Sequence, residues 1–213
     1  MKNKGRFLLS FLEYDWWKIL SSSLLVSFII GLSFNYKDAL RDDQILEIFV
    51  SASNKKISYQ EELLNSVPNN KIKGVQTNAY PTDYLQFNAL SSSLVSRSAD
   101  LFILSEDVLA KNNEYLSYAL PLEEEERTKI LSVDENLSFY KVDETRYFGI
   151  KIFDKSDSSF NEHFAFSSYF NFLETSYYLF VSKVSTNKND KDNKGNNLLL
   201  EYACSWLNIA LKK

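Results

Sequence analysis

The stretch DLFILSEDVLAK, residues 100–111, predicts a buried strand that runs directly into a helix. Residues 100–104 are almost all apolar, as in strands that are covered on both faces of a parallel sheet. Ser105 is a candidate N-cap for the helix, and Glu106 and Asp107 occupy its first turn, where the helix dipole favours acidic side chains. A strand followed at once by a helix is the typical unit of α/β proteins.

Two similar units precede this stretch. The β-rich run QILEIFV, residues 44–50, is followed by Ser58 and Glu61 at capping-box spacing, which predicts a short helix. A second strand is predicted at residues 72–77. A longer helix is predicted from Pro81 to about Arg97, because apolar residues recur there at helical spacing. This alternation predicts an α/β fold with a mainly parallel sheet.

The C-terminal half is less regular but predicts further elements of both kinds. Strands are expected at residues 137–142, 147–153 and 177–182, and helices at residues 123–127 and 198–211. The aromatic stretch at residues 160–172 fits neither a helical nor a strand period. Together these segments predict one α/β domain over residues 44–213.

The segment WWKILSSSLLVSFIIGLSF, residues 16–34, is long and apolar enough to cross a membrane. At ~1.5 Å of rise per residue such a helix matches the ~30 Å hydrocarbon layer of a bilayer. Its only charged residue is Lys18. A cleaved secretory signal is the alternative, but no small-residue cleavage pattern follows the apolar core. We therefore expect a retained single-pass anchor in the lipid bilayer.

Basic residues before this segment predict its orientation. Lys2, Lys4, Arg6 and Lys18 precede the apolar core, and an excess of basic residues stays on the cytoplasmic side. The predicted organisation is a cytoplasmic N-terminus at residues 1–15, a transmembrane anchor at 16–34, a tether at 35–43 and an extracytoplasmic domain at 44–213. The expected location is the cell membrane, with the C-terminal domain extracellular.

Charge and cysteine content narrow the classes of function. The chain has 24 basic and 28 acidic residues, and four basic and two acidic ones lie in the first 18, so 20 and 26 remain beyond them. This net negative charge argues against nucleic acid and against anionic lipid surfaces as partners. Cys204 is the only cysteine, which excludes an intramolecular disulfide. Its position in the closing helix predicts a small buried apolar residue.

No motif predicts catalysis or a metal site. Nucleophile-elbow, phosphate-loop and zinc-protease patterns are absent, and His163 is the only histidine. Residues 123–126 are four glutamates, best explained as a hydrated helix start. A near-match to a calcium loop has a lysine where an oxygen ligand should lie. Its residues are Asp190, Asp192, Lys194, Gly195 and Glu201. We expect no enzyme, no cofactor and no metal.

Three segments resemble, in order, parts of the extracellular solute-binding proteins of bacterial ABC transporters. They are SADLFILSEDVLAKN (residues 98–112), RYFGIKIFD (146–154) and YYLFVSKVST (177–186). The resemblance implies a fold like one lobe of a periplasmic binding protein, and a context in membrane transport. Family members have two lobes with the ligand between them, whereas this chain has room for one lobe and little more.

Polar residues follow each predicted strand of the parallel sheet. In open α/β sheets, ligands bind beyond the carboxyl ends of the strands, and these side chains suit a sugar or a peptide. The candidate ligand-binding residues are Ser51, Ser53, Asn54, Tyr80, Ser105 and Glu106, with Thr77, Asn78 and Asp107 beside them. The alternative is that these serines and acids cap helices, which favour the same residue types.

Two groups of residues are candidate partner contacts. Small residues spaced four apart in the anchor would allow another helix to approach closely, although such serines also bond to their own helix. Aromatic residues of the 160–172 stretch would form a partner surface if exposed and would fill the core otherwise. The candidates are Ser23, Ser27 and Gly31 in the anchor, and Phe164, Phe166 and Phe170 in the domain.

Two functions remain open. The first is an accessory subunit of a membrane transport complex, in which a solute-binding-like domain binds other proteins. Its expected partners are ABC transporter permease and ATPase chains, or a second copy of this chain. The alternative is a tethered receptor that delivers a small molecule such as a sugar or peptide to a transporter, or senses it.

Overall fold

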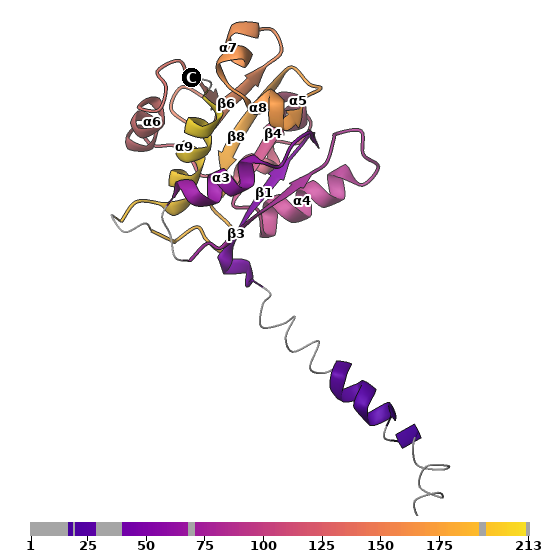
Figure 1. Ribbon diagram of the computed structural model, residues 1–213. Helices are drawn as coiled ribbons and strands as arrows, with labels where there is room; N and C mark the ends of the chain where they lie inside the picture. Colours follow the sequence, from indigo (N-terminus) through magenta and orange to yellow (C-terminus); the bar gives the residue numbers. More distant parts are fainter. Residues whose placement is uncertain (1–16, 19, 29–39, 68–70, 192–194, 212–213) are drawn as a thin grey trace, which may run out of the picture. The chain divides into compact units, whose positions relative to one another are not determined.

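The computed structural model describes residues 17–18, 20–28, 40–67, 71–191 and 195–211 (Figure 1). The chain forms two compact units, residues 1–40 and 41–213. In the first unit, residues 17–18 and 20–28 are helical. The predicted cytoplasmic segment 1–15 lies outside the described residues, and so do Gly31 and other parts of the predicted anchor and tether. Across the described ranges, no helix is both long and apolar enough to span a membrane.

The second unit is built on a six-stranded sheet with the strand order β3-β1-β4-β8-β6-β5 (Figure 1). The strands are β1 (Ile45–Val50), β3 (Gly74–Ala79), β4 (Leu101–Ser105), β5 (Phe139–Lys141), β6 (Tyr147–Asp154) and β8 (Ser176–Val181). β3, β1 and β4 are parallel, whereas β8, β6 and β5 join by antiparallel pairing. The predicted α/β class is confirmed, with a sheet that is parallel in one half and antiparallel in the other.

Helices cover both faces of the sheet (Figure 1). They are α3 (Tyr59–Ser66), α4 (Phe87–Arg97), α5 (Glu106–Lys111), α6 (Glu124–Leu131), α7 (Ser158–His163), α8 (Phe166–Tyr169) and α9 (Leu198–Ala210). Short 3-10 helices lie at η1 (Asp42–Gln44) and η2 (Asn113–Ser117), and β2 (Ser53–Asn54) pairs with β7 (Phe170–Asn171) in a second small sheet.

Alternation along the strands divides the core into two halves. Leu46 and Ile48 of β1 point to the face covered by α3 and α9, where Trp206 of α9 is fully buried. Phe49 points to the opposite face, where it packs near Phe87 of α4. In β-strands successive side chains point to opposite faces, so the apolar run of β1 serves both halves. Cys204 of α9 is buried in the same half of the core, as predicted.

Two details of the predicted helices are wrong. The helix expected from Pro81 begins only at Phe87, because the preceding residues form successive turns in which Tyr84 N donates to Pro81 O (3.0 Å) and Phe87 N to Tyr84 O (2.9 Å). The capping box at Ser58 is absent: this residue has helical backbone angles, and its side chain makes no capping bond. By contrast, Ser105 does cap α5 as predicted.

The aromatic stretch fills the core. Phe164, Phe166 and Phe170 are all fully buried, and Phe166 and Phe170 pack edge-on against Trp206 at centroid distances of 5.4 and 6.1 Å. These three residues fill the core, so the prediction that they form an exposed partner surface is wrong. Aromatic side chains bury large apolar areas, which suits a domain that has no disulfide.

Candidate functional site

At the carboxyl ends of the parallel strands, Ser51 and Ser105 hold the backbone together. Ser105 N donates to Ser51 Oγ (3.1 Å), and Ser105 Oγ accepts from Val108 N (3.2 Å) at the start of α5. Both serines are buried. Their hydroxyl groups are thus used within the fold, which matches the capping alternative rather than ligand binding.

The other predicted ligand residues do not converge on one point. Ser53 and Asn54 form β2 and pair with β7, while Glu106 is exposed on the first turn of α5. Tyr80 is half-buried between Phe49 and Tyr84, with ring centroids 6.5 and 5.6 Å away. The aromatic side chain expected at this edge is therefore present, but the hydroxyl and amide groups are not gathered around it.

The carboxyl groups of Glu174 and Asp107 form a pair at this edge that the sequence did not predict. Thr82 Oγ1 donates to Glu174 Oε1 (2.9 Å), and a hydrogen bond with Asp107 raises the pKa of Glu174. The Thr82–Glu174 bond joins the loop at residues 80–86 to the loop at residues 172–175, and we call these two segments the edge loops. The bond with Asp107 connects Glu174 to the first turn of α5. Glu174 lies in a connection with no local sequence signal, and only the folded chain brings it to Thr82.

The space beside this pair is small. A cavity of about 150 Å³ lies there, whereas sites for small molecules usually measure about 300–1,000 Å³. Its lining residues are Thr82, Phe87, Asn88, Val108, Lys111, Asn112 and Tyr115. In this structure the cavity is too small for the sugar or peptide expected at this edge.

The edge loops expose apolar side chains. Leu85 is 96% exposed and Tyr84 45% in the first loop, and Leu173 is 48% exposed in the second. Single exposed apolar residues are ordinary, but here two loops that are bonded to each other carry three of them. This surface suits contact with a protein better than capture of a small polar solute.

A larger depression lies at the opposite edge, where β1 and β3 begin. It has a volume of about 390 Å³, and we call it the amino-edge groove. Its lining residues are Asp42, Ile45, Glu47, Gln76, Arg97, Ser98 and Thr186. Glu47 is the only charged residue of β1, and an acid inside an apolar strand is the signal by which sequence analysis could have found this place.

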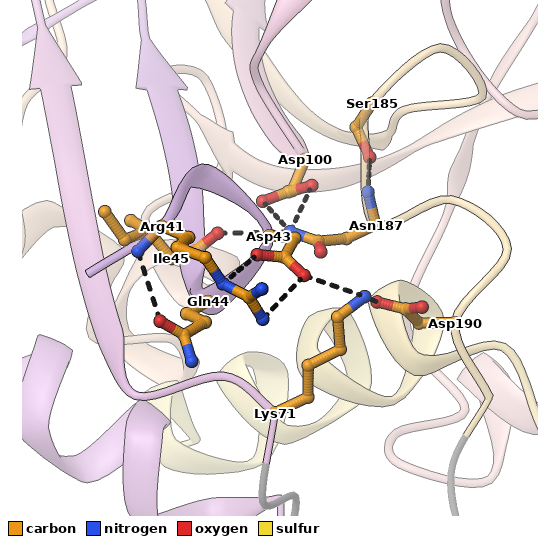
Figure 2. Close-up of polar contacts among 9 residues, drawn as sticks. All are labelled: Arg41, Asp43, Gln44, Ile45, Lys71, Asp100, Ser185, Asn187 and Asp190. Atoms are coloured by element: carbon orange, nitrogen blue, oxygen red, sulfur yellow. Dashed lines mark hydrogen bonds and ion pairs between the residues drawn. The ribbon is translucent and has the colours of Figure 1, made fainter.

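A buried polar network lies next to this groove (Figure 2). Asp100 accepts from Glu47 N (2.8 Å) and from Asn187 Nδ2 (3.2 Å to each carboxylate oxygen), and the same amide group donates to Ile45 O (3.1 Å). Burial raises the pKa of Asp100 to about 6, against the lowering effect of these bonds. The network fixes the starts of β1 and β4 against the loop at residues 185–187.

Ion pairs flank the network (Figure 2). Lys71 Nζ lies 2.7 Å from Asp190 and 3.9 Å from Asp43, which also pairs with Arg41. Lys129 likewise pairs with Glu201. The first and last acids of the calcium-loop pattern are thus occupied by lysines, and Asp192 and Lys194 lie outside the described residues. Among described residues, no cluster of three or more metal-binding side chains is present.

The single histidine and the single cysteine of the sequence have structural surroundings rather than a catalytic partner. His163 Nε2 bonds to Asp134, and the nearby Ser159 hydroxyl group donates to Asp157 (2.6 Å) instead of to the histidine. Burial raises the pKa of the Cys204 thiol to about 11, and a thiol is nucleophilic only as the thiolate. None of these groups forms a nucleophile and base pair.

The candidate surfaces of the described domain are therefore the exposed apolar side chains of the edge loops and the polar lining of the amino-edge groove. A search of protein-family models found no match, and searches of the curated proteins and of the solved structures found no significant match either.

Proposed function

We propose that this chain is a single-pass protein of the cell membrane whose domain, residues 41–213, acts outside the cell as an accessory subunit of a transport complex. The transport context comes from the resemblance to solute-binding proteins. The anchor is supported by the helical residues 17–18 and 20–28, among which Trp17, Leu24, Leu25 and Phe28 are each more than half exposed. Apolar side chains in such numbers on one helix need lipid or a partner around them.

The exposed apolar side chains of the edge loops are the observation that carries the subunit function. Leu85 and Leu173 lie on loops that the Thr82–Glu174 bond holds together, so they form a defined surface. Its occupant is an extracytoplasmic segment of another subunit, bound through apolar contacts. Interfaces of this kind owe most of their affinity to a few central apolar or aromatic residues.

Extraction of the full chain from native membranes in mild detergent, followed by mass spectrometry, tests this function. Recovery of permease and ATPase chains is the expected result. Leu85→Glu should abolish their recovery, because a charge would be buried without a partner. Val142→Glu is the control, since Val142 is also an exposed apolar residue but lies outside the edge loops. Equal recovery with both variants, or no transport protein at all, would contradict the proposal.

The receptor function is the second candidate, and the amino-edge groove is the observation in its favour. Its volume lies within the usual range for small-molecule sites, unlike that of the cavity at the carboxyl edge.

A further inference from the structure

We propose that the amino-edge groove binds a small zwitterion, a solute that carries both an ammonium group and a carboxylate. This goes beyond the subunit function, because it depends on neither the anchor nor a protein partner. It also places the ligand at the edge of the sheet opposite to the one where an open α/β fold ordinarily binds it.

The groove exists because α4 stops short of the starts of β1 and β3. Glu47 and Gln76 are paired in register on these neighbouring strands, and both line the groove. Farther along β1, Phe49 of the same face is covered by Phe87 of α4. α4 ends at Arg97, and Arg97 and Ser98 also line the groove. A strip of polar sheet surface is thus left open beside the last turn of a helix.

Glu47 is held in place with part of its carboxylate unused. Asn78 Nδ2 donates to Glu47 Oε1 (2.7 Å), and Glu47 N donates to the buried Asp100 carboxylate (2.8 Å). Within the described part of the chain, no hydrogen bond reaches the second carboxylate oxygen of Glu47. A fixed carboxylate with a free oxygen is a ready acceptor for an ammonium group, and charge-assisted hydrogen bonds of this kind are the strong ones.

Arg97 supplies the opposite charge. Arg97 is exposed, and among the residues that the structure describes it forms no ion pair with an acid. Glu47 and Arg97 therefore line one groove without neutralising each other. A guanidinium group matches a carboxylate in a two-pronged geometry, so the two ends of a zwitterion would satisfy both residues at once. The Thr186 hydroxyl group offers a further hydrogen bond, whereas Ser98 Oγ donates to Leu94 O (3.4 Å) and can only accept one from a ligand.

The wall of the groove is rigid before any ligand arrives. Ile45 and Thr186 line it, and the Asn187 side chain ties Ile45 O to Asp100 immediately behind them (Figure 2). Asn187 is fully buried, and its backbone N donates to Ser185 Oγ (3.1 Å). Binding to a fixed wall loses little conformational freedom, which favours affinity for a small solute.

The charges of the groove also predict an order of preference. Asp42 and Glu47 are acidic and Arg97 is basic, so the lining has one negative charge in excess. A zwitterion with a basic side chain should bind best, a neutral one less well and an acidic one worst. Asp42 is exposed, so solvent weakens its part in this preference.

Calorimetric titration of the full chain in detergent tests the proposal, with lysine, alanine, glutamate and the dipeptide lysyl-alanine as probes. Saturable binding of lysine in preference to glutamate is the expected result, and the dipeptide distinguishes a peptide site from an amino-acid site. Glu47→Gln and Arg97→Gln should each weaken binding about tenfold or more. Glu61→Gln and Lys183→Gln change exposed charges outside the groove and should leave affinity unchanged.

Thermal unfolding of each variant separates loss of binding from loss of folding. Absence of heat with all four probes in the unmodified chain would overturn the proposal. So would binding that Glu47→Gln and Arg97→Gln leave intact while their unfolding temperatures match that of the unmodified chain. Neither result affects recovery of partner chains through Leu85, so the two proposals fail independently.

Discussion

Asp100 makes the stability of the domain depend on pH in an unusual direction. Burial raises its pKa from 3.8 to about 6, so the folded state holds the proton more tightly than the unfolded chain. The stabilisation is complete below pH 4 and is lost as the pH rises through 6, by about 3 kcal/mol at most. In Asp100→Asn this loss of stability with rising pH should be absent, because asparagine does not ionise. Urea unfolding of both proteins at pH 4 and pH 7 measures it.

Other acids in the domain have lowered pKa values and therefore stabilise the folded state at high pH instead of at low pH. A hydrogen bond from Lys151 lowers the pKa of Asp154 to about 2, so its stabilisation is lost only in strong acid. Such acids are present in both the unmodified chain and Asp100→Asn, so their contributions cancel when the two pH dependences are compared. If the free energy of unfolding changes equally from pH 4 to pH 7 in the unmodified chain and in Asp100→Asn, the carboxyl group of Asp100 does not cause the pH dependence.

Gly149 is a second residue whose identity the packing dictates. A Cβ atom at this position in β6 would lie 2.6 Å from Cε1 of Phe180, whose ring is buried and stacked on Phe102 at 5.1 Å. Gly149→Ala should therefore destabilise the domain by ~1–3 kcal/mol, as overpacked cores do. In a double-mutant cycle by urea unfolding, Phe180→Leu should reduce the added cost of the alanine. Strictly additive effects would contradict this close approach.

At the scale of elements, the carboxyl pair links three segments that are separate in sequence. Glu174 bonds to Asp107 at the start of α5 and accepts from Thr82. Since the pKa of Glu174 is raised above its ordinary value of 4.5, the contact is strongest at low pH and weakens as the pH rises and Glu174 loses its proton. Hydrogen exchange in the edge loops should therefore speed up, beyond its intrinsic pH dependence, between pH 4 and 7. In Glu174→Gln this extra increase should vanish, because glutamine donates to Asp107 at every pH.

The apolar pattern of the sequence predicted helices and strands well where it was pronounced. The run around Leu101–Ser105 and the closing helix lie within a residue or two of their predicted bounds. A strand buried on both faces leaves a continuous apolar run, and an amphipathic helix leaves a clear period. The start of α4 was predicted too early, because Pro81 and apolar spacing are equally compatible with successive turns. Pairing of β2 with β7 joins distant parts of the chain and has no local signal.

The sites were harder to predict than the elements for the same reason. Ser51 and Ser105 have the residue types of a binding site, but their hydroxyl groups complete the backbone bonding of the fold. The groups that line the amino-edge groove come from η1, β1, β3, α4 and the loop before Asn187. Only Glu47, an acid within an apolar strand, departs from its surroundings enough to be noticed in sequence.

At the scale of the whole molecule, the domain should fold without the segment that precedes it. Residues 41–213 form one compact unit, and both halves of its core come from this range. Removal of residues 1–40 should leave the unfolding temperature within about 2 °C of that of the full chain, a small fraction of its stability. The shortened chain should remain in the supernatant after ultracentrifugation of cell extracts, whereas the full chain should sediment with membranes. Sedimentation of both chains, or of neither, would contradict the proposed anchor, because the two chains differ only in residues 1–40, which contain the anchor.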